Sequence, residues 1–432
     1  MAVPASLDRR RFLQGAATGV ASVGTTAWMS ASAAPAASER LVVGLIGAGD
    51  FGRRQHLNRL LLPNPRVEVA AVCDVNQIHR EMAARDIHAQ RGKRVAVYKD
   101  FRNLLDRSDI DAVVIVTPDH WHAVIAVAAM EAGKDIYCEK PLTLTISEGK
   151  TLVATARRYG TVFQTGSQQR SDNYYYRRAH SLVQAGRIGK LRRVTTHLGQ
   201  SPQGTWEQAQ TPPSYLDWDF WLGPSPYVDY TPNRCNYLFR WYSNYSGGVL
   251  TDHGAHENDI AQWMIGADGS GPTKIEGSGQ FHDSGPHDVL RQFEVRFTYG
   301  NHGGIELLCT TQRSSFGSSM NLYGDDGRIS VSRRRISASD PDIITTESKN
   351  YDDRLLESYV RHYENWIDCI HSRERPVGDV EIGHRSVTVC HLANLAVRLG
   401  RALSWNVDRE SFVDDPAANR LLRRPMRSPW RI

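Results

Sequence analysis

The sequence predicts an α/β protein of two domains, a doubly wound parallel sheet followed by an α+β domain with a largely antiparallel open sheet. Three observations carry this prediction. The chain has 432 residues, more than the roughly 250–300 residues over which a single hydrophobic core grows. Residues 41–168 alternate β-branched runs with helical stretches, as in a parallel sheet covered by helices. Residues 289–331 show successive strand patterns, which indicate antiparallel pairing.

The first domain is expected at residues 40–170, where hydrophobic periodicity predicts alternating strands and helices. The predicted strands are Leu41–Ile46, Val67–Cys73, Ala112–Val116, Asp135–Cys138 and Thr161–Thr165. The predicted helices are His56–Leu62, Gln77–Ala89, Phe101–Leu105, His122–Ala132 and Ile146–Tyr159.

The second domain is expected at residues 171–432. It begins with a linking helix and closes with two long helices, and residues 206–245 form a long ordered loop rich in aromatic side chains. The predicted helices are Arg177–Gln184, Arg354–Ser372 and Gly383–Leu403. The predicted strands are Leu191–Leu198, Val289–Tyr299, Gly304–Gln312, Ser319–Tyr323 and Arg328–Val331.

Residues 1–34 are predicted to be an export signal. Arg9 and Arg10 form a twin arginine before the weakly apolar stretch 15–29, and the small residues Ala31-Ser32-Ala33 suit a signal peptidase. The alternative, an amphipathic first helix, is disfavoured because the stretch has no 3.6-residue period. We therefore expect a periplasmic or secreted protein. No other run reaches the roughly 18 apolar residues of a membrane span, so none is expected in the mature chain.

Composition excludes several classes of protein. A hydrophobic fraction of 41% and a charged fraction of 23% are those of an ordinary globular protein. The net charge of +5 gives no electrostatic footprint for nucleic acid. Six scattered cysteines without a CxxC pair do not form a disulfide framework, although one bridge stays open.

A glycine motif predicts a dinucleotide site. Gly47-Ala48-Gly49-Asp50-Phe51-Gly52 follows the first strand and opens a helix, where a pyrophosphate binds at the positive helix N-terminus. Asp74 ends the second strand and is placed to accept hydrogen bonds from an adenosine ribose, which favours NAD over NADP. Arg53 and Arg54 weaken this preference slightly because they could lie near a phosphate.

Three further motifs resemble the Gfo/Idh/MocA oxidoreductases, the relatives of glucose-fructose oxidoreductase and inositol dehydrogenase. They are Thr117-Pro118-Asp119-His120-Trp121-His122, Glu139-Lys140-Pro141, and the segment 247–256 with Asp252 and His256. The resemblance runs from about Leu41 to the C-terminus, and an exported branch is similar in the aromatic loop. It implies a Rossmann domain, a C-terminal substrate-binding and oligomerisation domain, and a homo-oligomer. The cofactor site is expected to include Thr117, Pro118, His122, Glu139 and Lys140 beside the glycine motif and Asp74.

The residue types of these motifs suit hydride transfer. Lys140 ends a parallel strand, where its ammonium group can stabilise a developing alkoxide. Asp252 and His256 are four residues apart, so on a helix the carboxylate could orient an imidazole that acts as general base. The resemblance assigns the same catalytic set, Lys140, Asp252 and His256.

A metal site is the alternative use of this segment, because Asp252, His253, His256 and Glu257 are of metal-ligating types. Neighbouring residues on a helix do not face each other, so we expect no metal.

The aromatic loop bears on the substrate, since aromatic faces pack against sugar C–H surfaces while Tyr and Trp edges bind hydroxyl groups. Trp221, Tyr237 and Trp241 are the candidate substrate contacts from the loop, and Gln168 and Arg170 are weaker candidates.

Together these patterns predict an exported NAD-dependent oxidoreductase that acts on a sugar, glycoside or polyol and keeps its NAD tightly bound. The resemblance leaves an alternative open, an NAD-assisted glycoside hydrolase or lyase that oxidises a sugar transiently and eliminates the glycosidic bond. A binding protein without chemistry is a third class, disfavoured by the intact Lys140, Asp252 and His256.

Overall fold

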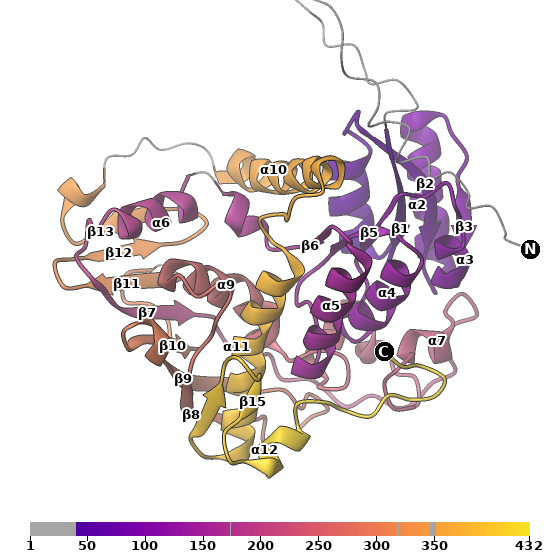
Figure 1. The fold of residues 1–432 in the computed structure, drawn as a ribbon. Coiled ribbons are helices and arrows are strands. Elements are labelled where there is room, and N and C mark those ends of the chain that lie inside the picture. The colour runs from indigo at the N-terminus through magenta and orange to yellow at the C-terminus, as the bar shows by residue number, and fades with distance from the viewer. Residues whose placement is uncertain (1–39, 173, 318, 345–350) are drawn as a thin grey trace, which may run out of the picture.

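The structure is a computed structural model that describes residues 40–172, 174–317, 319–344 and 351–432, without the side chains of 351–355. The predicted signal segment lies outside the described residues. The remaining chain forms two sheets with helices packed against them (Figure 1).

The first sheet is parallel throughout and has the strand order β3-β2-β1-β4-β5-β6. Its strands are β1 (Leu41–Ile46), β2 (Val67–Cys73), β3 (Ala96–Tyr98), β4 (Ala112–Ile115), β5 (Asp135–Cys138) and β6 (Phe163–Thr165). The connecting helices are η2 (Gly52–Leu61), α2 (Gln77–Arg91), α3 (Phe101–Leu105), α4 (Asp119–Glu131) and α5 (Ile146–Tyr159). This is the predicted doubly wound sheet, and its order reverses between β1 and β4, where such sheets bind ligands.

Local signals fix the ends of these helices. Asn76 caps α2 by accepting hydrogen bonds from the backbone N–H groups of Ile78 and His79. Thr145 and Glu148 form a reciprocal capping box at the start of α5. The helix after β1 begins at Gly52 instead of the expected His56, and it is wound as a π-helix.

The second sheet has nine strands in the order β13-β12-β11-β7-β10-β9-β8-β14-β15. All its pairs are antiparallel except β7 with β10. The strands are β7 (Leu191–His197), β8 (Lys274–Gln280), β9 (Gln292–Tyr299), β10 (Ile305–Thr310), β11 (Met320–Gly324), β12 (Arg328–Val331), β13 (Ile336–Ala338), β14 (Leu403–Asn406) and β15 (Ser411–Phe412). The largely antiparallel second sheet is therefore confirmed.

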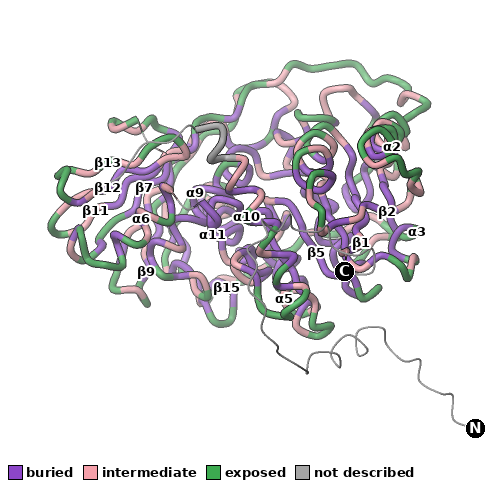
Figure 2. Tube along the Cα trace, turned by 90° about the horizontal axis from the view of Figure 1, so that it is seen from above, coloured by how far each residue is buried: buried purple, intermediate pink, exposed green. Residues whose placement is uncertain are grey.

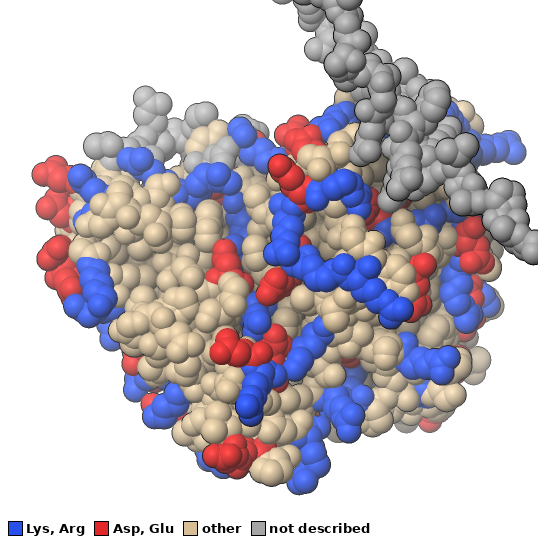
Figure 3. All heavy atoms as spheres, viewed as in Figure 1, with Lys and Arg blue, Asp and Glu red and all other residues tan. Residues whose placement is uncertain are grey.

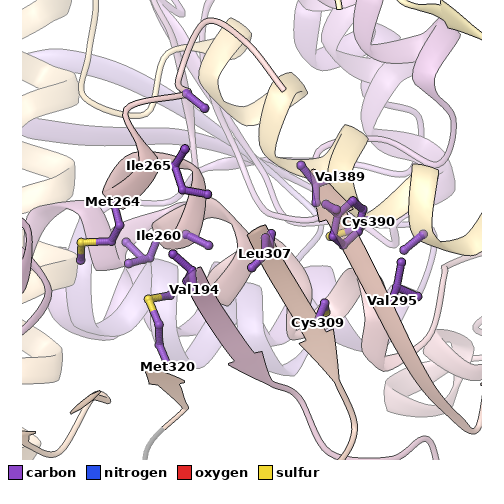
Figure 4. Packing of buried hydrophobic residues seen from close by; sticks show 14 of the residues in the cluster. Val194, Ile260, Met264, Ile265, Val295, Leu307, Cys309, Met320, Val389 and Cys390 are labelled. Carbon is purple, nitrogen blue, oxygen red and sulfur yellow. The ribbon is translucent and has the colours of Figure 1, made fainter. Parts of the chain in front are cut away.

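Helices bury one face of this second sheet. They are α6 (Tyr176–Gln184), α8 (Val249–Asp252), α9 (Gly254–Ile265) and α11 (Val380–Leu399). Ile260 of α9 and Val389 of α11 pack with Val194, Val295 and Leu307 of the sheet (Figure 4). The tube in Figure 2 shows this buried interior running between the helices and the strands.

Helix α10 (Tyr351–Ser372) belongs to the second half of the sequence but packs on the first sheet. Its Tyr363 and Trp366 are buried in one cluster with Leu45 and Tyr137 of that sheet. The rings of Tyr137 and Tyr363 stack with centroids 4.4 Å apart. The two halves of the sequence therefore share a core.

The aromatic loop is ordered, as predicted, and contains the short helices α7 (Trp218–Leu222), η4 (Pro232–Arg234) and η5 (Asn236–Trp241). Trp121 donates a hydrogen bond to the carbonyl of Trp221 over 2.9 Å, which ties the loop to the start of α4. Trp430 stacks on Phe220 with centroids 5.4 Å apart and meets Trp121 edge-on at 4.7 Å. The segment that follows α12 (Pro416–Arg420) therefore packs against both the aromatic loop and the first domain.

The surface in Figure 3 carries basic and acidic side chains interspersed. None of the helices in the described part of the chain combines the length and the hydropathy of a membrane-spanning segment.

Candidate active site

A cavity of about 630 Å³ opens at the carboxyl ends of the first sheet's strands and is lined by residues of both halves of the sequence. The glycine motif and Asp74 line it after β1 and β2, and Lys140 lines it after β5, together with Asp252 and His256. The structure therefore brings the predicted nucleotide site and the predicted catalytic set into one cavity.

The glycine motif has the shape that a dinucleotide needs. Gly47 has φ +94°, and a side chain at Gly52 would place its Cβ 2.0 Å from the Gly47 carbonyl oxygen. At Gly49 the nearest atom to such a Cβ, on His79, is 3.8 Å away, so this backbone stays open to the cavity. A pyrophosphate fits here because two glycines close the turn and the third leaves room beside a helix N-terminus.

Asp74 also lines the cavity. Its carboxylate accepts hydrogen bonds from the backbone N–H groups of Ala48 and Asn76, both over 2.8 Å. These bonds fix the carboxylate beside the glycine motif. An acid held at this position suits the ribose hydroxyls of NAD and repels a 2′-phosphate.

Lys140 and Asp252 form an ion pair in the lining of the cavity. The Lys140 ammonium donates to Oδ1 of Asp252 over 2.8 Å and to the Asp252 backbone carbonyl over 3.0 Å, and the Arg240 guanidinium lies 3.5 Å from the same carboxylate. Burial opposes ionisation of Asp252, but the charges of Lys140 and Arg240 outweigh it and hold its pKa well below the ordinary range. Asp252 is therefore a stable anion that fixes Lys140.

His256 lines the cavity beside this pair. Burial, together with the positive charges of Lys140 and Arg333, lowers the pKa of His256 well below its ordinary value. The imidazole is uncharged at neutral pH. Its Nδ1 is buried and has no hydrogen-bond partner among the described residues.

The expected pairing of Asp252 with His256 needs correction. The helix is interrupted at His253, between α8 and α9, and the Asp252 carboxylate contacts Lys140, Arg240 and His253 instead. Asp252 is thus a positioning residue for the ammonium group.

Most of the other predicted cofactor residues line the cavity, and one, His122, does not. Thr117, Pro118 and Glu139 line the cavity, as do Asp50 and Phe51 of the glycine motif. His122 is buried behind it, with its two ring nitrogens 2.8 and 2.9 Å from the carbonyl oxygens of Pro141 and Thr117. The prediction that His122 contacts the cofactor directly is therefore wrong. His122 instead links the two segments that carry Pro141 and Thr117.

Two of the five predicted substrate contacts, Trp221 and Tyr237, line the cavity. The other three are outside its lining. Arg170 is 3% exposed and its guanidinium binds the carboxylates of Asp259 and Asp268. Gln168 donates to the Tyr359 hydroxyl over 2.7 Å.

Trp241, the third, is buried in the core of the second domain. For these three residues the expected substrate contact is replaced by a structural role.

The sequence analysis did not predict three cations of the cavity, Lys99, Arg240 and Arg333. Arg240 lies in the aromatic loop, and its proximity to the Gly247–His256 motif was the available signal. Arg333 belongs to a run of three arginines, Arg333-Arg334-Arg335, between two predicted elements. That run marks a hairpin tip, but nothing local indicates what the tip faces.

Metal binding is the alternative to acid–base catalysis for four residues of this segment, Asp252, His253, His256 and Glu257. The part of the chain that the structure describes contains no cluster of three or more His, Cys, Asp or Glu side chains arranged to hold a metal ion. Metal independence itself stays a prediction.

Known proteins share both halves of this architecture. Residues 41–167 match a family model described as "Oxidoreductase family, NAD-binding Rossmann fold", and residues 197–432 match "Oxidoreductase family, C-terminal alpha/beta domain". The scyllo-inositol 2-dehydrogenase (NAD(+)) of Bacillus subtilis (strain 168) is 24% identical over 346 residues, 77% of this chain and 87% of that protein.

Two further similarities are more limited in what they show. Glycosyl hydrolase family 109 protein 1 of Shewanella sp. (strain ANA-3) is 40% identical over 124 residues, 28% of this chain and 27% of that protein. The WlbA dehydrogenase from Bordetella pertussis, solved in complex with NADH and UDP-GlcNAcA, has a TM-score of 0.62 at 18% identity, covers 85% of this chain and 99% of that chain, and shows the fold. On the two family matches, the chain belongs to the Gfo/Idh/MocA oxidoreductases and has an NAD-binding Rossmann domain.

Proposed function

We propose that this oxidoreductase transfers hydride between a CH–OH carbon of a sugar, glycoside or polyol and NAD that it holds tightly. The observation that carries the proposal is the fixed Lys140–Asp252 pair beside an uncharged His256, in the same cavity as the glycine motif.

The residues divide the work as follows. Lys140 donates a hydrogen bond to the reacting hydroxyl oxygen and stabilises its developing negative charge. Asp252 holds Lys140 in place, and His256 takes the hydroxyl proton as general base. NAD, when bound, supplies the hydride acceptor. Trp221 and Tyr237 offer aromatic surface to the substrate's C–H groups.

The cavity supports the specificity for NAD and its retention. Asp74 favours NAD over NADP. Trp430 stacks on Phe220 of the aromatic loop, which lines the cavity, and this contact stabilises the loop. Denaturing the purified protein is expected to release stoichiometric NAD or NADH. Release of stoichiometric NADP would contradict the role given to Asp74.

Turnover is tested with a panel of sugars, polyols and aryl glycosides while the absorbance of the reduced nicotinamide is followed. Lys140→Met and His256→Ala are expected to lower kcat by about 100-fold each, the scale of such groups, and to keep the bound nucleotide. If His256→Ala turns over normally, another residue is the base, with His253 or a tyrosine first in line.

A redox-neutral glycosidase is the second candidate, favoured by the local 40% identity to the Shewanella protein. Transient oxidation would acidify the neighbouring C–H, and the aglycone would leave by elimination to give an unsaturated ketone. Water would then add to the double bond, and the hydride would return to the ketone, so that the sugar is hydrolysed with no net redox change. Aryl glycosides separate the two candidates, because the oxidoreductase accumulates a ketone and the glycosidase releases the aglycone without net reduction of NAD.

Localisation and assembly complete the proposal. The twin arginine Arg9-Arg10 supports export to the periplasm or beyond, which fractionation of cells carrying Arg9→Lys/Arg10→Lys tests. The sheet face opposite α9 and α11 presents exposed side chains, among them Arg193, Glu294 and Arg296, and we propose that it pairs in a homo-oligomer. Light scattering of the purified protein measures the stoichiometry.

A further inference from the structure

Among the residues that the structure describes, one cation of the cavity has no carboxylate partner. Four Lys or Arg residues line it: Lys99, Lys140, Arg240 and Arg333. Lys99 pairs with Asp217 at 2.8 Å, Lys140 pairs with Asp252 at 2.8 Å, and Arg240 lies 3.5 Å from Asp252. Arg333 has no hydrogen bond and no ion pair with any residue that the structure describes.

Arg333 is placed in the cavity by a tight hairpin. Strands β12 and β13 pair up to Val331 and Ile336, and the Ser332 N–H donates to the Arg335 carbonyl over 2.9 Å, which closes the turn. The turn leaves Arg334 and Arg335 exposed, whereas Arg333 is half-buried and lines the cavity. Of three consecutive arginines, the fold therefore directs one toward the site.

Arg333 lines the cavity together with Lys140, Asp252 and His256. Its charge is close enough to His256, the residue proposed as base, to contribute to the lowered pKa of that imidazole. Glu257 is buried and is outside the cavity lining. Burial raises the pKa of its carboxyl group more than the charge of Arg333 lowers it, so Glu257 is a poor counter-ion.

A partly desolvated guanidinium without a partner costs free energy, and a bound anion removes that cost. The planar fork of arginine matches carboxylate and phosphate oxygens in a bidentate geometry. Lys140 and Arg240 already share the Asp252 carboxylate. The lining carboxylates Asp119 and Glu139 contact Ser246 and His56, so none of these three acids is paired with Arg333.

We propose that the cavity selects a substrate bearing an anionic group, a carboxylate or a phosphate, and that Arg333 binds this group while Lys140 addresses the reacting hydroxyl. The inference rests on the proposed function and refines it from sugars in general to acidic sugars. Arg333 is then the residue that determines specificity.

Binding is measured by titration calorimetry on the purified NAD-loaded protein with three hexoses that differ only at the terminal carbon: glucose, glucuronate and glucose 6-phosphate. The same comparison uses galactose, galacturonate and galactose 6-phosphate. Wild-type protein is expected to bind at least one acidic member about 10- to 100-fold more tightly than its neutral counterpart, the range of one charge-assisted bond. Comparing the carboxylate with the phosphate identifies which anion the site prefers.

The variant Arg333→Gln is expected to lose this preference while binding of the neutral sugar is little changed. Arg334→Gln removes one positive charge from the next residue of the hairpin, which is outside the cavity lining. This variant is expected to keep the preference for acidic sugars. The preference should narrow as salt is added, because the site is only partly shielded from solvent. Equal binding of neutral and acidic members by the wild type, or a preference that survives in Arg333→Gln, overturns the inference.

Turnover by the same samples separates this inference from the proposed function. If acidic sugars bind selectively through Arg333 but never reduce the nicotinamide or lose an aglycone, the proposed activity fails and the specificity stands. If neutral sugars react and acidic ones do not bind, the activity stands and the specificity fails.

Discussion

Replacing Asp252 with asparagine tests the central arrangement of the site. The substitution keeps the size of the side chain and one carbonyl oxygen, but it removes the charge that Lys140 and Arg240 share. Lys140 then keeps only neutral acceptors, including the backbone carbonyl 3.0 Å away. The ammonium group loses the anchor that fixes it before substrate arrives.

The size of the effect follows from burial. The side chains of Lys140 and Asp252 are 14% and 8% exposed, so the pair is poorly screened. A hydrogen bond between charged groups contributes about 1.5–3 kcal/mol, and removing one partner of a buried pair costs about 3–5 kcal/mol. With about 1.4 kcal/mol for each factor of ten in rate, a loss of about 3 kcal/mol lowers kcat by about 100-fold.

The matched control is Asp217→Asn. Asp217 and Lys99 are also 2.8 Å apart, but their side chains are 30% and 55% exposed, where ion pairs contribute about 0–1 kcal/mol. Asparagine also keeps the helix cap that Asp217 provides to α7. This variant is expected to retain nearly full turnover.

Three measurements on each variant decide the matter: the single-turnover rate of nicotinamide reduction, the amount of bound NAD, and the melting temperature. We expect Asp252→Asn to be slow, to retain NAD and to melt at a lower temperature than the wild type. Asp252→Glu, which restores the charge, should recover part of the rate. If Asp252→Asn reacts as fast as the wild type, Lys140 needs no anchor and the reasoning fails.

Three further predictions follow from the structure. Gly52→Ala should fail to bind NAD or to fold, because its Cβ would lie 2.0 Å from the Gly47 carbonyl oxygen, whereas Gly49→Ala should fold normally and bind NAD more weakly; melting curves and nucleotide release distinguish them. Burial lowers the pKa of His391 from 6.5 to about 3. Below about pH 6.5 the unfolded chain therefore takes up a proton that the folded protein does not, and the free energy of unfolding decreases as the pH is lowered. His391→Gln should therefore reduce the pH slope of the unfolding free energy between about pH 6.5 and 3 by up to about 1.4 kcal/mol per unit, and identical slopes for the two proteins would count against this. Chelator treatment should leave turnover unchanged; activity lost and restored by one divalent ion would make Asp252 and His256 metal ligands.

The first sheet could be predicted from sequence because its signals are local. Strands such as β1 and β4 are runs of β-branched and apolar residues, and each is followed by a turn or cap that the sequence shows directly. Strand β8 was missed because its sequence, KIEGSGQ, carries glycine and polar residues in place of an alternating pattern. Its pairing with β9 fixes it as a strand.

Site residues that belong to a local sequence motif could be predicted. Site residues whose position depends on contacts with distant parts of the chain could not. Lys140 and the glycine motif lie at strand ends, and their position follows from the fold class. Arg170 was misassigned because its partners, Asp259 and Asp268, lie 89 and 98 residues further along the chain. Arg333 was missed for the same reason, since the register of β12 with β13 places it in the cavity.

The packing of α10 on the first sheet sets an order of events during synthesis. The six parallel strands are complete at Thr165, but the apolar face formed by Leu45 and Tyr137 stays uncovered until Tyr363 and Trp366 leave the ribosome. At roughly 5–20 residues per second, the nascent chain exposes this face for about 10–40 s. The nucleotide-binding half therefore reaches its native core only after most of the second half exists. During this interval the uncovered apolar face makes the growing chain prone to aggregation.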